Sequence, residues 1–220
     1  MATNRYRLVI GNKNWSSWSL RPWLAMRRAG VPFEEINVRL RQADSKAAIA
    51  KYSPSGMVPL LLDGDLAIWD SLAIIEYLAD AHPETALWPV DRRARGLARA
   101  VAAEMHSGFV PLRSTCPMEI LARNPLDPVP DDVAGNIRRI VDIWKECRRD
   151  YGKGGPFLFG TFGGADAMFA PVVHRFRTFA IPVEGDARHY YDAMLALPAM
   201  AEWVRDGLAE TLIIERVEAV

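Results

Sequence analysis

The chain has 220 residues, half of them hydrophobic, with 27 basic and 27 acidic side chains and a formal net charge of zero. This length can bury a sizeable core in one large domain or two small ones. A neutral chain lacks the attraction that dominates non-specific nucleic-acid binding, so we expect no nucleic-acid partner. No run reaches the roughly 18 apolar residues of a membrane span, and the two cysteines form no metal or redox motif. We expect a cytoplasmic protein with neither a membrane partner nor a bound metal.

The first part of the chain is predicted to alternate strands and helices. A strand over residues 6–10 precedes a helix that ends near Gly30, and a strand over 33–40 precedes a short helix before Pro54. The next segment, PLLLDGDLAIW, has two apolar runs separated by Asp63-Gly64, which suits the tight turn of an antiparallel hairpin. The helix DSLAIIEYLADAHP follows, so the predicted order is β-α-β-α-β-β-α.

The character of the sequence changes after a proline-containing connector at residues 82–91. Only helical patterns follow, and Gly108 and Pro111 should interrupt the first of them. The prediction is an α/β domain over residues 1–85, then an all-α domain over residues 92–220. Later helices are expected over residues 133–151, 164–178, 187–196 and 198–208.

The stretch NWSSWSLRP places three serines at the first strand-to-helix turn. Because Pro22 favours the first turn of a helix, Ser19 is the predicted N-cap, which leaves Ser16 and Ser17 in the loop above it. A hydroxyl near the positive end of a helix dipole can donate to a thiolate and favour its ionised form. The four histidines lie in no GxSxG context, so a serine-hydrolase nucleophile is not indicated. Simple capping remains the alternative for these serines.

Two further turns could hold a peptide-like ligand. Pro59 opens a strand, and a cis Val58-Pro59 bond would leave the backbone of Val58 free for a ligand, whereas a trans proline on an edge strand is equally compatible with the sequence. Asp70-Ser71 begins a helix, where free N–H groups and a hydroxyl suit a carboxylate and Asp70 suits an ammonium group. The alternative is that Asp70 only caps the helix.

The motifs SSWSLRPWLA, SPSGMVPLL and DSLAIIEYL together resemble the soluble glutathione transferase superfamily, over essentially the whole chain. The serine run is similar to that of the serine-type, zeta-like group. The resemblance implies a thioredoxin-like glutathione-binding domain, an all-helical domain with a second-substrate site, and a homodimer. The implied function is addition of the glutathione thiolate to a small electrophile. A maleylacetoacetate-type isomerase and a non-catalytic glutathione-binding module are the alternatives.

The resemblance also implies roles for individual residues. Ser16 would activate the thiol, with Ser17 a close second, and Val58 beside cis Pro59 would bind the cysteinyl backbone of glutathione. Its γ-glutamyl end would meet Asp70 and Ser71, and its glycine carboxylate would meet Gln42 or Lys46. The chain departs from the family pattern at three positions: Met57 replaces a polar residue, Trp18 replaces the zeta-class cysteine, and Gly163 replaces the usual Ser or Thr of a capping box that ends at Asp166.

The second-substrate site is expected to include tryptophans of the NWSSWSLRP stretch, called the serine loop below, and one face of the first C-terminal helix. The candidate residues are Trp15, Trp18, Met105, His106, Phe109 and Arg113. An apolar stripe at helical spacing is equally compatible with a core face, although a histidine and an arginine are poor core residues. Arg113 suits an anionic or carbonyl-bearing substrate, because its planar guanidinium binds carboxylates through paired hydrogen bonds.

Overall fold

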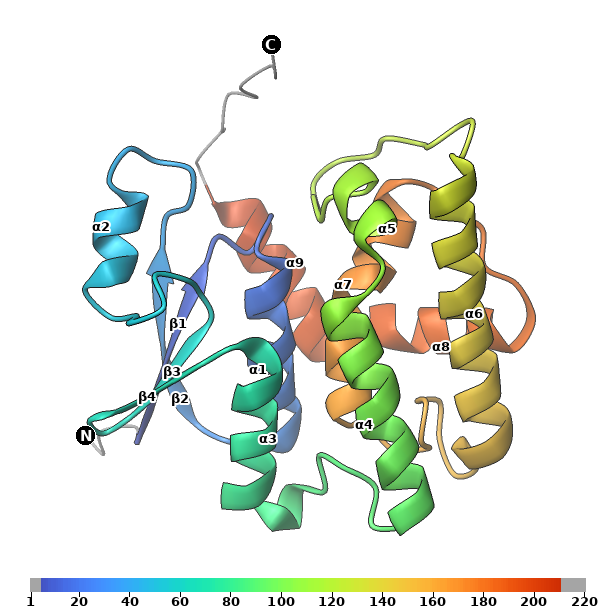
Figure 1. Ribbon diagram of the computed structural model, residues 1–220, viewed down its shortest axis with the longest axis horizontal. Helices are drawn as coiled ribbons and strands as arrows, with labels where there is room; N and C mark the ends of the chain where they lie inside the picture. Colours follow the sequence, from blue (N-terminus) through green and yellow to red (C-terminus); the bar gives the residue numbers. More distant parts are fainter. Residues whose placement is uncertain (1–4, 211–220) are drawn as a thin grey trace.

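A four-stranded sheet forms the centre of the N-terminal domain in the computed structural model, which describes residues 5–210 (Figure 1). The strand order is β2-β1-β3-β4. β1 pairs parallel with β2 and antiparallel with β3, and β3 and β4 form the hairpin expected around Asp63-Gly64. The strands are β1 (Tyr6–Gly11), β2 (Phe33–Val38), β3 (Leu60–Asp63) and β4 (Leu66–Trp69).

Helices cover both faces of this sheet, because successive side chains of a strand point to opposite sides. Leu8 and Ile10 of β1 belong to the core shared with α1 (Ser17–Ala29) and α3 (Ser71–Ala81). Val9 packs instead in a smaller cluster with Ile49 of α2 (Ser45–Ala50). The thioredoxin-like order predicted from the sequence is confirmed.

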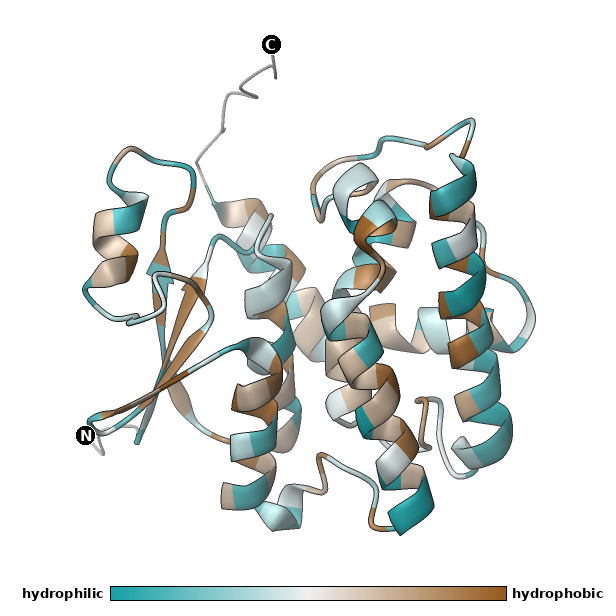
Figure 2. Ribbon diagram, viewed as in Figure 1, coloured by the Kyte–Doolittle hydropathy of each residue, from teal (hydrophilic) through white to brown (hydrophobic). Residues whose placement is uncertain are grey.

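The rest of the described chain is helical, and α4 ends just before Gly108, as the sequence predicts. In Figure 2 apolar residues gather on the central strands, whereas α6 carries both polar and apolar residues along its length. The helices are η1 (Pro83–Thr85), α4 (Arg92–Ser107), α5 (Val110–Thr115), α6 (Asp131–Tyr151), α7 (Gly164–Thr178), α8 (Gly185–Leu195) and α9 (Pro198–Ala209). No helix within residues 5–210 is long and apolar enough to cross a membrane.

The two parts share one hydrophobic core, because α1 packs on α3, α7 and α9 (Figure 1). The proline-containing connector at residues 82–91 includes η1 and ends directly before α4. The ends of the two predicted domains, residues 1–4 and 211–220, lie outside the described residues.

A buried carboxylate fixes the start of α7. Asp166 is fully buried, and its Oδ2 accepts a hydrogen bond from the Gly163 N–H at 2.8 Å. Its Oδ1 accepts from the Leu158 N–H at 3.1 Å, which ties the preceding turn to the helix. The acidic half of the capping box is therefore present, although Gly163 supplies no side-chain acceptor.

We expect Asp166→Ala to lower the free energy of unfolding by roughly 2–4 kcal/mol, because the backbone N–H groups of Leu158 and Gly163 lose their buried acceptor. Urea denaturation measures this change. Asp142→Ala is the matched control, since Asp142 is an exposed acidic residue on α6. Equal stability losses in the two variants would contradict the structural role of Asp166.

Candidate functional site

A cavity of about 380 Å³ lies where the loop before β3, the end of β4 and the start of α3 meet the first turn of α1. It brings together five residues that the sequence analysis selected, from motifs up to 53 positions apart in the chain. The Val58-Pro59 peptide bond is cis, as the resemblance implies. The lining residues are Trp18, Ser55, Met57, Val58, Pro59, Trp69, Asp70 and Ser71.

Asp70 both caps α3 and faces the helical domain. Its Oδ1 accepts hydrogen bonds from the N–H groups of Leu72 at 2.8 Å and Ala73 at 3.4 Å. Its Oδ2 lies 2.7 Å from Nε2 of His106 on α4. Burial raises the pKa of Asp70, but the hydrogen bonds from His106 and from the backbone outweigh it, so the pKa lies below its ordinary value. The cavity wall therefore carries an ionised carboxylate at neutral pH.

The serine loop differs from its prediction in one respect. α1 begins at Ser17 with Ser16 as its N-cap residue, so the expectation that Ser19 caps the helix is wrong. The Ser19 hydroxyl instead accepts hydrogen bonds from the Gly11 N–H at 3.1 Å and from Ser16 Oγ at 2.7 Å. The physical reason is that β1 runs directly into the loop and leaves the Gly11 donor to be satisfied by a side chain.

Two buried guanidinium groups hold serine hydroxyls of the site. Arg175 on α7 donates through Nη2 to Ser17 Oγ at 3.3 Å, and Arg21 donates through Nη1 to Ser71 Oγ at 3.5 Å. Burial, reinforced by neighbouring arginines, lowers the pKa of Arg21 to about 9 and that of Arg175 to about 10. Both groups stay protonated at neutral pH, so two positive charges lie behind the hydroxyls of Ser17 and Ser71.

Trp18 connects the cavity to the helical domain. The centroid of its ring lies 4.1 Å from Cζ of Arg21 and 4.9 Å from Cζ of Arg113. The His106 ring meets it edge-on, with centroids 5.3 Å apart. Arg113 also donates to the main-chain oxygens of His106 and Gly108, which fixes the break between α4 and α5.

Of the six residues predicted for the second-substrate site, Trp18 alone is among the described residues that line the cavity. Met105 and Phe109 are buried in the hydrophobic core, with 1% and 8% of their surfaces exposed, because this side of α4 packs on α7. The core interpretation therefore holds for these two residues. Trp15 is partly exposed and does not line the cavity; the guanidinium of Arg41 lies 5.7 Å from its ring.

Four residues predicted to contact glutathione also lie outside the cavity lining. Gln42 and Lys46 are exposed, near the start of α2. Ser16 and Ser17 are buried beside the cavity, with 6% and 8% of their surfaces exposed. No group of His, Cys, Asp and Glu side chains within residues 5–210 could hold a metal ion.

Comparisons with known proteins agree with this geometry. Residues 15–81 match the model of the glutathione S-transferase N-terminal domain, and residues 119–206 match that of the C-terminal domain. The chain belongs to the glutathione S-transferase family. It is 28% identical to glutathione S-transferase Z2 of Arabidopsis thaliana, over 89% of this chain and 90% of the relative.

Two further relatives carry isomerase names. A probable maleylacetoacetate isomerase of Caenorhabditis elegans is 34% identical over 48% of each chain. The solved structure of a bacterial maleyl pyruvate isomerase, a zeta-class glutathione S-transferase, superposes with a TM-score of 0.67 at 25% identity, covering 90% of this chain and 95% of that one. The transferase therefore has relatives with transferase names and others with isomerase names.

Sequence reasoning missed several residues that the structure of this transferase brings to the site. Trp69 lines the cavity because it pairs with Leu60 in the hairpin, directly beside Pro59. The pairing of Trp69 with Leu60 could have been predicted from the hairpin centred on Asp63-Gly64. Arg175 lies between His174 and Phe176 on α7, and no pattern in the sequence indicates its contact with Ser17.

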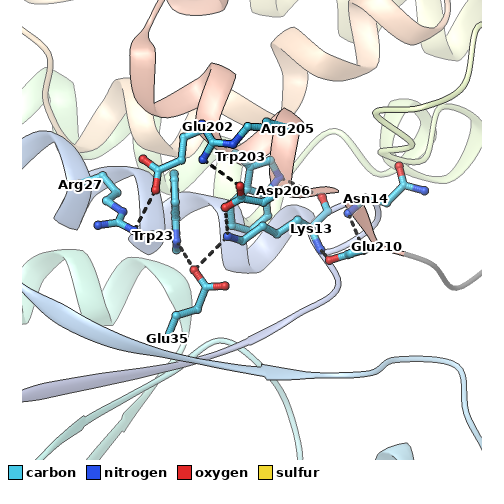
Figure 3. A network of polar contacts seen from close by, with 10 residues as sticks. All are labelled: Lys13, Asn14, Trp23, Arg27, Glu35, Glu202, Trp203, Arg205, Asp206 and Glu210. Atoms are coloured by element: carbon cyan, nitrogen blue, oxygen red, sulfur yellow. Dashed lines mark hydrogen bonds and ion pairs between the residues drawn. The ribbon is translucent and has the colours of Figure 1, made fainter. Parts of the chain in front are cut away.

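A network of polar contacts holds the serine loop of the transferase against α9 (Figure 3). Lys13 Nζ lies 3.0 Å from Glu35 of β2 and 2.8 Å from Asp206 of α9. It also lies 5.0 Å from the Trp23 ring and 5.4 Å from the Trp203 ring. The backbone N–H groups of Lys13 and Asn14 donate to the carboxylate of Glu210, just after α9.

We expect Lys13→Met to lower the free energy of unfolding by about 2 kcal/mol, because Glu35 and Asp206 keep their charges and lose the cation between them. Thermal or urea unfolding measures the loss. Lys51→Met removes a lysine that is exposed near α2 and should change stability by less than about 0.5 kcal/mol. A Lys13→Met protein as stable as the parent would contradict this role.

Proposed function

We propose that this transferase binds glutathione in the cavity, ionises its thiol and adds the thiolate to a small electrophile. The observation that carries the proposal is the juxtaposition of Val58, beside cis Pro59, with Asp70 and Ser71 in one cavity. A backbone strand edge and an amino-acid head-group site lie side by side there, as a γ-glutamyl tripeptide requires.

Glutathione is placed by charge and by backbone pairing. The ionised Asp70 attracts the γ-glutamyl ammonium, and the hydroxyl of Ser71, backed by Arg21, suits the carboxylate of the same head group. The N–H and C=O of Val58 would pair with the cysteinyl residue. Gln42 and Lys46 are kept as candidates for the glycine carboxylate, because both are exposed polar residues.

Thiol activation is assigned to the serine loop. The side chain of Ser16 makes no capping hydrogen bond to the backbone, and its hydroxyl donates to Ser19 Oγ. Rotation of this hydroxyl would transfer its hydrogen bond from Ser19 to a thiolate. Ser17 accepts from Arg175, which leaves its own proton to donate. The positive charges of Arg21 and Arg175 favour a thiolate over a thiol in this position.

We expect Ser16→Ala to lower kcat/KM for conjugation by roughly ten- to a hundredfold, because a hydrogen bond to a charged sulfur is lost. The pKa of bound glutathione, read from thiolate absorbance in the ultraviolet, should rise in parallel. Ser17→Ala is the paired variant and should have the smaller effect. Ser107→Ala, at an exposed serine of α4, is the control.

Two results would contradict this assignment. If Ser16→Ala is as active as the parent, the Ser16 hydroxyl does not activate the thiol. Retention of the parent on immobilised glutathione without turnover on a broad panel of electrophiles would favour the non-catalytic binding module.

A glutathione-dependent isomerase is the second candidate, favoured by Arg113 beside Trp18 and by the isomerase names of two relatives. Burial lowers the pKa of Arg113, and its guanidinium lies 4.9 Å from the ring of Trp18, which lines the cavity. A carboxylate of a maleyl-type substrate would pair with this guanidinium.

We expect Arg113→Met to raise KM for an anionic substrate such as maleylpyruvate by about tenfold and to leave KM for an uncharged aryl halide unchanged. Steady-state kinetics with both substrates test this difference. An equal change for both substrates would mean that Arg113 acts only through packing.

Two properties of the family are also proposed for this chain. We infer a homodimer, with the arginine-rich start of α4 as a candidate contact, and a cytoplasmic location.

A further inference from the structure

The two oxygens of the Asp70 carboxylate differ in what they can offer a ligand. Oδ1 accepts hydrogen bonds from the N–H groups of Leu72 and Ala73, at 2.8 Å and 3.4 Å. Each carboxylate oxygen accepts about two hydrogen bonds, so Oδ1 is fully used by the helix. The Asp70 side chain is 40% exposed and lines the cavity. An ammonium group in the cavity therefore pairs with Oδ2.

Within residues 5–210, Oδ2 has one hydrogen-bond partner, and it belongs to the helical domain. Nε2 of His106 on α4 lies 2.7 Å from this oxygen. Because an ionised carboxylate can only accept, the ring nitrogen carries the proton and donates it to Oδ2. This bond leaves one acceptor position of Oδ2 for a ligand. His106 is not among the described residues that line the cavity, so it acts on a ligand through Asp70.

The backbone of Asp70 is strained, which makes its contacts more important. Its φ is 76° and its ψ is 135°, a conformation that residues other than glycine rarely adopt. Such a conformation persists only where the surrounding structure fixes the residue. The start of α3 holds Oδ1, and His106 holds Oδ2 from the opposite domain.

The imidazole ring of His106 is itself held in place. It meets the ring of Trp18 edge-on, with centroids 5.3 Å apart and an angle of 71° between the planes. The main-chain oxygen of His106 accepts a hydrogen bond from Nη1 of Arg113 at 3.2 Å. The hydrogen bond from Nε2 to Asp70 therefore has a fixed direction.

We propose that His106 is a positioning residue for glutathione, which holds Oδ2 of Asp70 in the direction that pairs with the γ-glutamyl ammonium group. This inference rests on the proposed function. It moves His106 from the second-substrate site, where helical spacing placed it, to the glutathione side. The two domains then recognise the amino group of the ligand together, and a ligand without that group gains nothing from His106.

Isothermal titration calorimetry with two matched ligands tests the proposal. The ligands are glutathione and glutaryl-cysteinyl-glycine, the same tripeptide without the γ-glutamyl amino group. We expect the full-length protein to prefer glutathione, because only glutathione offers an ammonium group to Asp70. No electrophile is present, so the result does not depend on turnover.

Three variants separate the hydrogen bond from the packing of the ring. His106→Phe keeps a ring against Trp18 but removes the donor, and it should weaken glutathione about tenfold and leave the deamino analogue unchanged. His106→Gln places an amide donor near the position of Nε2 and should keep the parental preference. His189→Phe is the matched control, because His189 is an exposed histidine of α8 that lies 3.5 Å from Asp186. It should change neither ligand.

Steady-state kinetics give a second readout. In His106→Phe the KM for glutathione should rise, whereas kcat and the KM for the electrophile should stay at the parental values. Circular dichroism melting establishes that each variant is folded before its binding is compared.

The proposal is overturned if His106→Phe weakens both ligands equally or neither, if His106→Gln loses the preference for glutathione, or if His106→Phe raises the KM for the electrophile instead. A parent that binds no glutathione overturns it together with the proposed function. The predicted preferences without turnover of any electrophile would support the role of His106 and contradict the proposed thiol chemistry.

Discussion

The position of the Lys13 ammonium group constrains the whole site. Its side chain is only 6% exposed and is surrounded by Trp23 and Glu35 from the first domain and by Trp203 and Asp206 from α9. A cation removed from water needs compensating charge, and here neither domain supplies all of it. The loop between β1 and α1 is therefore placed by both domains together, three residues before Ser16.

The candidate site is also built from groups of both domains. Each main group on the thioredoxin-like side is paired with one from the helical side: Asp70 with His106, Ser17 with Arg175, and the Trp18 ring with Arg113. A thiolate formed in the loop would lie close to two buried guanidinium groups that only the assembled domains bring together. The continuous hydrophobic core shared by the sheet domain and the helical domain holds these paired groups in place.

The parts predicted from sequence were those set by local chemistry. Asp63-Gly64 made the hairpin, and Gly30 ended α1 in the left-handed conformation, with φ of 69°. Val58, Pro59, Asp70 and Ser71, which the sequence analysis selected, lie together around one cavity, because each belongs to a turn at the end of a strand or the start of a helix.

The errors arose where distant segments compete for one group. The role of Ser19 depends on a free N–H of Gly11 in the preceding strand, which no capping rule includes. The burial of Met105 depends on how α4 packs on α7, and Arg175 lies 158 positions from Ser17. Helical periodicity identifies a face of a helix but does not identify its neighbour.

The most direct test of the central claim is a crystal structure of the protein with glutathione bound. The account predicts that the γ-glutamyl group lies on Asp70 and Ser71, that the cysteinyl backbone pairs with Val58, and that the sulfur lies within hydrogen-bond distance of the Ser16 or Ser17 hydroxyl. Glutathione bound elsewhere, or a sulfur pointing away from both serines, would contradict it.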